Sequence, residues 1–197
     1  MVSVRKSHQM SAASFEQWLD TLDLNAAKKK SLEELRQSTH HFFDANTSCQ
    51  TKSLEMVEIL SGLNLDTESL CAAFICPLFE YDHISLEYIE EHFSPQIYML
   101  CKGVSQMEAI KALQQTQSSQ VSANQIDNIR RMLLAMVEDV RAVVIKLAER
   151  LCDLRDQKNN DEESRVLAAK ESANIYAPLA NRLGIGQLKW ELEDISF

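Results

Sequence analysis

The sequence has few of the residues that interrupt regular structure. Its 197 residues include four Gly and three Pro, against roughly 7% and 5% in average proteins. Tight hairpin turns depend on these residue types, so their scarcity argues against a sheet-rich fold and predicts long helices. Aromatic residues make up only 7% of the chain, so Leu, Ala, Val, Ile and Met are expected to form most of the core.

Signals for a membrane or for secretion are also missing. No stretch reaches the roughly 20 apolar residues that a membrane span needs, and no apolar segment follows the polar first six residues. The cysteines are odd in number and form no CxxC pair; they are Cys49, Cys71, Cys76, Cys101 and Cys152. We expect a cytoplasmic protein whose reduced thiols pack as small hydrophobic groups. A zinc site built from Cys71, Cys76 and Cys152 is the less favoured alternative.

A net charge of −9 disfavours nucleic-acid binding by this part of the protein, because phosphate contacts need clustered Lys and Arg. Lys146, Arg150 and Arg155 are interspersed with acidic residues, so we interpret them as helix-surface ion pairs at i,i+3 and i,i+4 rather than as a phosphate site. The sequence has no P-loop or dinucleotide-binding fingerprint.

Apolar spacing predicts an all-α bundle of about ten helices. In the first half, Asn25 and Asp66 are expected to cap helices, and Pro77 to kink or end the second of these near residue 76. Residues 46–48 are expected to form a loop, and Pro95 to begin a helix. The expected helices cover residues 14–22, 25–44, 53–63, 66–76, 85–91, 95–103 and 104–117.

In the second half, residues 115–125 are rich in Gln, Ser and Thr and are expected to form a loop. Apolar residues over 133–154 then follow alternating steps of four and three, which predicts a core helix more readily than a coiled coil. Further helices are expected over 162–181, interrupted or bent at Pro178, and over 187–195. The last helix still carries apolar residues where the chain ends, which predicts that the protein continues.

Three pairs of segments, taken in their order along the chain, form a recognisable set of motifs. They are VEIL at 57–60 with CAAFI at 71–75, RMLLAMVEDVR at 131–141 with KLAERL at 146–151, and IYAPLANRLGI at 175–185 with KWELED at 189–194. Together they resemble the RelA/SpoT family, and specifically its amino-terminal hydrolase region, an HD-type helical phosphohydrolase. The resemblance implies weakly matched helices over 1–49, an HD-like domain over 50–180, and over 181–197 the start of a connection to a synthetase domain.

The family's hydrolase holds one divalent cation, such as Mn²⁺, with a His, a His-Asp pair and a later Asp, and the metal activates the attacking water. By resemblance the first His falls on Lys52, the His-Asp pair on Cys76 and Pro77, and the later Asp on Glu149. Lysine is itself a cation, a lone thiol suits Mn²⁺ poorly, and proline offers no side-chain ligand. The resemblance therefore implies loss of the metal site, with no metal, catalytic or substrate-binding residue in this chain.

Other family positions change as well. The acidic pair used for general acid–base catalysis falls on Glu80 and Tyr81, the family's Asn on Asp153, and a basic pair on Phe43 and Asp44. These changes leave one acid–base carboxylate and remove positive charge that would attract phosphate. We hypothesise that the Lys52 ammonium replaces the lost metal charge and holds carboxylates of Glu80, Glu149 and Asp153.

The resemblance implies a catalytically inactive regulatory or structural domain of a (p)ppGpp synthetase acting in the stringent response. The whole protein is expected to use Mg²⁺, ATP and GTP or GDP, and to work on ribosomes with uncharged tRNA, while this chain itself needs no cofactor and contacts the synthetase domain. An active Mn²⁺-dependent (p)ppGpp hydrolase and a non-catalytic nucleotide sensor are the alternatives. The sequence leaves homo-oligomer formation open.

Overall fold

The structure is a computed structural model that describes residues 11–115, 126–128, 130–131, 139–157 and 160–196. Within these residues it contains ten α-helices, one π-helical turn and no β-strand, which confirms the all-α prediction. The chain divides into two compact units, Met1–Lys102 and Gly103–Phe197. The boundaries predicted at residues 49 and 180 remain predictions.

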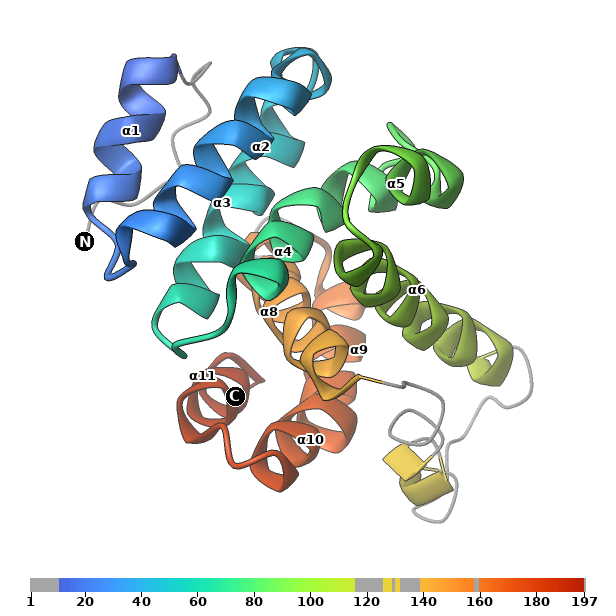
Figure 1. Ribbon diagram of the computed structural model, residues 1–197. Coiled ribbons are helices and arrows are strands. Elements are labelled where there is room, and N and C mark those ends of the chain that lie inside the picture. The colour runs from blue at the N-terminus through green and yellow to red at the C-terminus, as the bar shows by residue number, and fades with distance from the viewer. Residues whose placement is uncertain (1–10, 116–125, 129, 132–138, 158–159, 197) are drawn as a thin grey trace. The chain divides into compact units, whose positions relative to one another are not determined.

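The first unit holds five helices and the start of a sixth (Figure 1). They are α1 (Ala12–Asp20), α2 (Ala26–Asp44), α3 (Thr47–Ser61), α4 (Thr67–Glu80), α5 (Leu86–His92) and α6 (Pro95–Gln115), which continues into the second unit. Helices α2, α3 and α4 pack against one another. The Asn25 and Asp66 side chains accept hydrogen bonds from the backbone N–H groups of Lys28 and Ser69, so both predicted caps are confirmed.

Helix α4 forms the centre of the first unit. Every residue from Ser69 to Leu78 is buried, as expected for a helix that is apolar on all faces. Phe74 is 1% exposed, and its ring centroid lies 4.9 Å from that of Phe43 on α2 and 6.0 Å from that of Phe15 on α1. The aromatic contacts therefore join α1, α2 and α4 into one core.

Pro77 does not end α4 near residue 76, one of the two outcomes predicted for it. The helix continues to Glu80, and the Tyr81 N–H donates to the Pro77 carbonyl at 3.1 Å. Proline cannot donate to the carbonyl four residues earlier, but the neighbouring Cys76 and Leu78 are 3% and 0% exposed. Burial of these apolar groups offsets the lost hydrogen bond and maintains the helix.

Two predicted boundaries in this unit are wrong. Residues 47 and 48 belong to α3, which begins at Thr47 instead of Ser53, because residues such as Cys49 are buried and extend its packed face. Residues 95–115 form the single helix α6 instead of two. A lone Gly103 lowers helix stability by only about 1 kcal/mol relative to Ala, too little to break a helix with buried neighbours on both sides.

The second unit is built on α8 (Val140–Asp156), whose residues 142–152 are all buried. Around it lie α9 (Glu162–Glu171), the π-helical turn η2 (Ser172–Tyr176), α10 (Ala177–Arg182) and α11 (Gly186–Ser196). Gly184 has φ = +73° in the turn between α10 and α11, a conformation that favours glycine.

The apolar seam is confirmed as core from Val144 onward, since Val144, Leu147, Leu151 and Leu154 are buried, whereas Val140 at the start of α8 is 55% exposed. Its first part, and the loop predicted over 115–125, lie almost wholly outside the described residues. The helix predicted over 162–181 is interrupted before Pro178, at η2, and Pro178 instead lies in the first turn of α10. Proline is favoured there because the amide it lacks would have no partner within that turn.

No helix in the described part of the chain is both long and apolar enough to cross a bilayer.

Candidate functional site

Lys52 and Glu80 form an ion pair within the first unit. Lys52 lies on α3 and Glu80 ends α4, two helices that pack side by side. The Lys52 Nζ lies 2.6 Å from Glu80 Oε2, and the two side chains are 2% and 36% exposed. The hypothesis that Lys52 holds the Glu80 carboxylate is therefore confirmed for this pair.

Two further groups lie near this ammonium. The Lys52 Nζ lies 5.6 Å from the centroid of the Tyr81 ring, close enough for a cation–π interaction. The pKa of the Cys49 thiol is raised to about 12, chiefly by burial and also by the negative Glu80, while the positive Lys52 opposes both effects. The thiol beside this pair is thus kept protonated at neutral pH.

Cys76 and Pro77 lie in the buried part of α4. The Cys76 Sγ lies 3.6 Å from the Sγ of Cys101 on α6. The side chain of Cys76 thus packs against a second thiol, while Pro77 contributes only its ring to the core. The zinc alternative named Cys71, Cys76 and Cys152, whereas the thiol that Cys76 contacts is that of Cys101.

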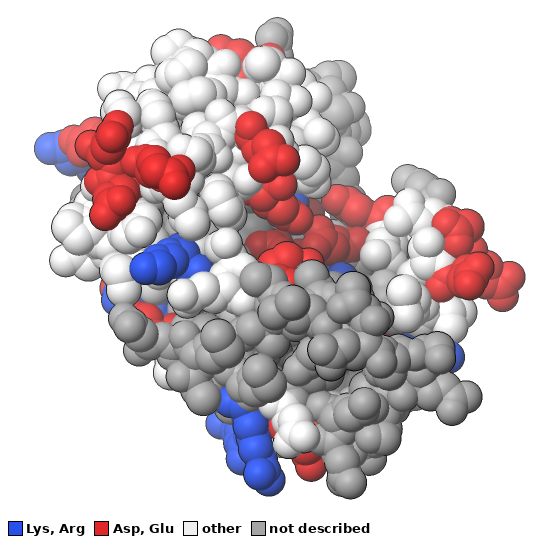
Figure 2. Space-filling view, turned by 90° about the vertical axis from the view of Figure 1, so that its right-hand side faces the viewer, with Lys and Arg blue, Asp and Glu red and all other residues white. Residues whose placement is uncertain are grey.

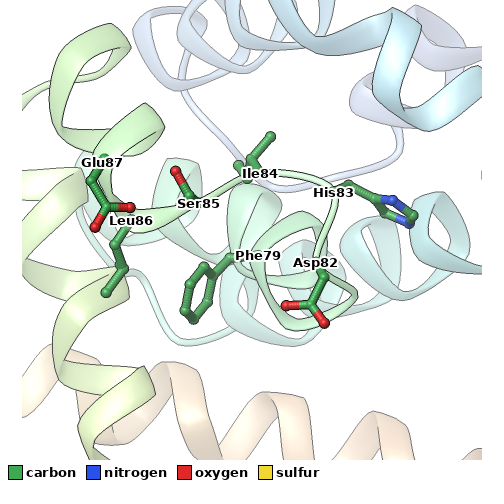
Figure 3. A pocket seen from close by; sticks show the side chains of 7 residues that line it. All are labelled: Phe79, Asp82, His83, Ile84, Ser85, Leu86 and Glu87. Atoms are coloured by element: carbon green, nitrogen blue, oxygen red, sulfur yellow. The ribbon is translucent and has the colours of Figure 1, made fainter.

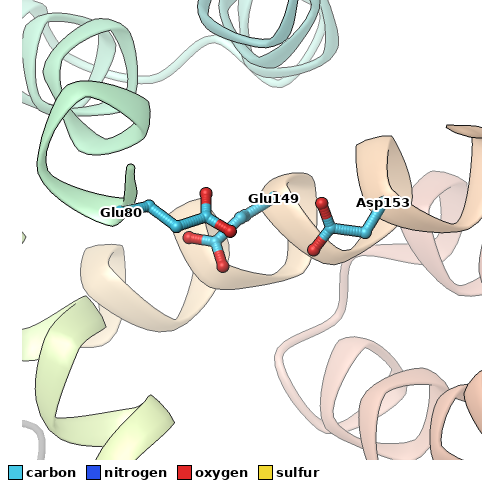
Figure 4. Close-up of side chains that lie close together, drawn as sticks. All are labelled: Glu80, Glu149 and Asp153. Carbon is cyan, nitrogen blue, oxygen red and sulfur yellow. The ribbon is translucent and has the colours of Figure 1, made fainter. Parts of the chain in front are cut away.

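Glu149 and Asp153 lie one turn apart on α8, in the second unit (Figure 4). Each offers a carboxylate oxygen within 4.8 Å of one from the other. Glu149 is 4% exposed and Asp153 is half-buried. The same figure shows Glu80 at the end of α4, in the first unit.

The buried Glu149 is paired with Lys146. The Lys146 Nζ lies 2.5 Å from Glu149 Oε1 and 2.6 Å from Glu108 Oε2 on α6. Burial works to lower the pKa of this ammonium, but the carboxylates of Glu149 and Glu108 outweigh burial and hold the pKa well above its usual value. Lys146 therefore remains charged and neutralises Glu149.

The interpretation of the α8 charges as surface pairs is only partly correct. The i,i+3 pair of Lys146 and Glu149 is present, but both side chains are buried. Arg150 pairs with Glu171 at 2.8 Å, and Arg155 with Glu191 at 2.5 Å, on helices other than α8. The sequence reasoning missed that α8 is buried along most of its length, although Lys146 stands within an otherwise apolar run from 142 to 148.

A hollow of about 350 Å³ follows α4, where the chain turns toward α5. Its polar lining includes Asp82, His83 and Glu87, and Asp82 has φ = +59°. Figure 3 shows the His83 ring and the Glu87 carboxylate directed toward opposite ends of this turn. Because catalysis needs polar groups that converge on one point, this arrangement does not form an acid–base site.

Acidic side chains gather in several places on the face that Figure 2 presents. Together with a net charge of −9, this surface would repel an anionic ligand such as a nucleotide phosphate.

The family model for the HD domain matches residues 23–186. Over all of its length the chain is 47% identical to a GTP pyrophosphokinase of Escherichia coli K12 and 46% identical to one of Haemophilus influenzae. It is 40% identical, over 71% of its length, to a probable guanosine-3′,5′-bis(diphosphate) 3′-pyrophosphohydrolase of Synechocystis. The chain spans 27% of the E. coli protein, 28% of the H. influenzae protein and 18% of the Synechocystis protein. From its fold and these matches, the chain belongs to the HD domain family, in the RelA/SpoT group that its motifs predicted.

Proposed function

We propose that this chain is a catalytically inactive HD domain that supports or restrains the synthetase domain of a (p)ppGpp synthetase. The observation that carries the proposal is the ion pair between Lys52 and Glu80, 2.6 Å apart. By resemblance, Lys52 stands where the family places a metal ligand and Glu80 where it places an acid–base carboxylate. A protonated amine repels a divalent cation, and its contact with Glu80 occupies the carboxylate that catalysis would use.

The remaining donor groups do not fit a hard divalent cation either. Cys76 is a buried thiol in contact with another sulfur, and Pro77 offers no ligand atom. Glu149 keeps a carboxylate, but the Lys146 ammonium lies 2.5 Å from it. Mg²⁺ prefers oxygen ligands and Mn²⁺ accepts oxygen and imidazole ligands, so we derive no catalytic step through a metal in this chain.

The relatives support a proposal for the role of the whole protein. The chain matches about a quarter of the length of proteins named GTP pyrophosphokinase. We therefore propose that the rest of the protein transfers a pyrophosphoryl group from ATP to GTP or GDP with Mg²⁺, in the cytoplasm. Binding to ribosomes carrying uncharged tRNA is part of the same proposal, and the synthetase domain is the partner proposed for this chain.

The Synechocystis relative, named a probable pyrophosphohydrolase, supports a rival function. In that case the chain would remove the 3′ pyrophosphate of (p)ppGpp with Mn²⁺. The two functions share one fold, so similarity of sequence does not distinguish them. The metal-ligand atoms that the chain offers must distinguish them instead.

The test is to incubate the 197-residue chain with ppGpp and Mn²⁺ and to follow the release of GDP and pyrophosphate. We expect no turnover above a protein-free control. Turnover that a chelator abolishes would overturn the proposal and establish the hydrolase.

A second arm tests the assignment of positions. A variant carrying Lys52→His, Cys76→His, Pro77→Asp and Glu149→Asp restores the family's ligand set. We expect this variant to bind Mn²⁺, detected as loss of the electron paramagnetic resonance signal of the free ion, whereas the unaltered chain leaves that signal unchanged. A correctly folded variant without Mn²⁺ affinity would contradict the assignment.

Calorimetry with ppGpp on the unaltered chain tests the nucleotide-sensing alternative. The acidic surface and the occupied Glu80 lead us to expect no heat of binding at micromolar concentrations of ligand. Saturable binding without turnover would establish a sensor in place of a purely structural domain.

A further inference from the structure

Two cysteines from helices α4 and α6 bring their sulfur atoms into contact inside the first unit. The Sγ atoms of Cys76 and Cys101 lie 3.6 Å apart. Cys76 is 3% exposed and Cys101 is 0% exposed. The Cys101 Sγ also lies 3.9 Å from the carbonyl oxygen of Ala72, one turn before Cys76. Both contacts direct the Cys101 side chain toward α4.

This separation is short enough for a covalent bond after a small movement. A disulfide has an S–S length of about 2.05 Å and holds Cβ atoms at about 3.5–4.5 Å. The two sulfurs must therefore approach by about 1.5 Å. Rotation of two cysteine side chains with a slight shift between the helices supplies a movement of this size.

Two other thiols of the unit are poorly suited to compete. Burial, with a smaller contribution from nearby carboxylates, raises the pKa of Cys49 and of Cys71 to about 12. The thiolate is the reactive form of cysteine, so these two side chains remain largely unreactive near neutral pH. Contact with a second sulfur distinguishes Cys76 from both of them.

The proline after Cys76 also weakens the end of α4 locally. Pro77 follows Cys76 directly and cannot donate a hydrogen bond to the Ala73 carbonyl. The last turn of α4 therefore has one backbone hydrogen bond fewer than an ordinary helical turn, and its local opening breaks one bond fewer. Local openings of this kind admit small molecules to buried groups.

We propose that Cys76 and Cys101 are a modification site that closes to a disulfide on reaction with a peroxide. One thiolate attacks a peroxide oxygen, which breaks the O–O bond and leaves a sulfenic acid. The second thiolate attacks that sulfur, forms the S–S bond and expels hydroxide. Two thiols and one hydrogen peroxide thus give one disulfide and two waters, with two electrons passing from sulfur to oxygen.

The bond would tie α4 to α6 across a loop of 25 residues. Glu80 lies one turn beyond Cys76 on α4. Oxidation would thereby restrain the helix end that carries the carboxylate paired with Lys52. This inference is independent of the proposed function, because it depends only on contacts within the first unit.

The test treats the reduced 197-residue chain with hydrogen peroxide at modest molar excess, without denaturant. We expect an intact mass lowered by two hydrogens and restored by dithiothreitol. Trypsin has no cleavage site between residues 53 and 101, so both cysteines fall in one tryptic peptide. Cleavage after glutamate separates them and should release a cross-linked pair of peptides containing Cys76 and Cys101.

Matched variants identify the partners. Cys76→Ser and Cys101→Ser should each abolish the mass loss, whereas Cys71→Ser, in the same glutamate-cleaved peptide as Cys76, should retain it. Closing a loop of this length should raise the Tm of the oxidised chain by several degrees. Three results would each overturn the proposal: oxidation that gives only sulfinic acid, a disulfide between two chains, and thiols that react only after unfolding in urea. Each result can be measured on the unaltered chain.

Discussion

The buried ammonium of Lys52 has the Glu80 carboxylate as a partner 2.6 Å away, on a different helix 28 residues further along the chain. A lysine that is 2% exposed requires such a partner, because removing an ammonium from water costs several kcal/mol unless the charge is compensated. The pair links α3 to α4. By resemblance, its two residues stand at positions where the family has a metal ligand and an acid–base carboxylate.

Glu80→Gln should destabilise the chain. It removes the charge that compensates a buried ammonium, and because Glu80 is one-third exposed, water reduces the penalty to about 1–2 kcal/mol. Lys52→Met should cost less than about 1 kcal/mol, since an apolar side chain suits this buried position. The double variant should be about as stable as Lys52→Met alone, as measured by urea unfolding.

A surface pair provides the control for this cycle. Lys30 and Glu34 lie 3.7 Å apart on α2, with side chains 76% and 66% exposed. Glu34→Gln should change the free energy of unfolding by less than about 0.5 kcal/mol. If Glu34→Gln and Glu80→Gln lowered the free energy of unfolding equally, burial of the lysine would not explain the effect of Glu80→Gln.

Glu149→Gln should cost about 3 kcal/mol, because it leaves the Lys146 ammonium buried with a weaker partner. Glu108 contacts the same ammonium but is 57% exposed, so Glu108→Gln should cost under about 1 kcal/mol. Urea unfolding of the two variants under identical conditions measures the difference. A larger loss for Glu108→Gln would show that the exposed contact is the important one.

Alkaline pH should destabilise the chain from about pH 9 upward. Burial raises the pKa of Cys49 and Cys71 from 9.0 to about 12. Between these values the unfolded chain has released protons that the folded chain retains, so the free energy of unfolding falls as pH rises. Each thiol contributes a slope of up to about 1.4 kcal/mol per pH unit.

Cys71→Ala should therefore show a shallower loss of stability between about pH 9 and pH 10 than the unaltered chain. Burial also raises the pKa of Tyr176, to about 12, so this phenol adds a similar loss only above its ordinary value of 10.0. Urea unfolding at several pH values in a reducing buffer measures the slope. Parallel pH profiles for the two proteins would contradict the prediction.

The two tryptophans should report opposite environments. Trp18 is 5% exposed and its Nε1–H donates to Glu58 Oε1 at 2.7 Å, whereas Trp190 is 74% exposed. Trp190→Phe should leave a fluorescence that acrylamide quenches weakly, and Trp18→Phe one that it quenches strongly.

The stabilities of the same two variants should also differ. Trp18→Phe should cost about 1–2 kcal/mol, because Glu58 loses a hydrogen-bond donor. Trp190→Phe should have an effect within about 0.5 kcal/mol. Weak quenching of Trp190 in the Trp18→Phe variant would contradict its exposure and would indicate that another surface, such as a second copy, covers α11.

Sequence reasoning succeeded where the physical cause is local. The side chains of Asn25 and Asp66 cap helices because each lies near the amide it satisfies. It allowed α4 to end at Pro77, but the helix continues to Glu80 because packing against other helices offsets the local cost of proline. It was wrong for Arg150 and Arg155, whose partners lie on other helices that spacing along α8 does not reveal.

The sequence by itself determined that the chain is helical, since four Gly and three Pro leave little room for hairpins. It also determined which residue types stand at positions 52, 76 and 77, and therefore which ligand atoms those positions offer. Only the tertiary structure decided that Lys52 pairs with Glu80, that Lys146 is buried against Glu149, and that the Cys76 sulfur meets that of Cys101. Contacts between separate helices depend on how those helices pack, and the packing reflects apolar burial over a whole unit rather than any local pattern.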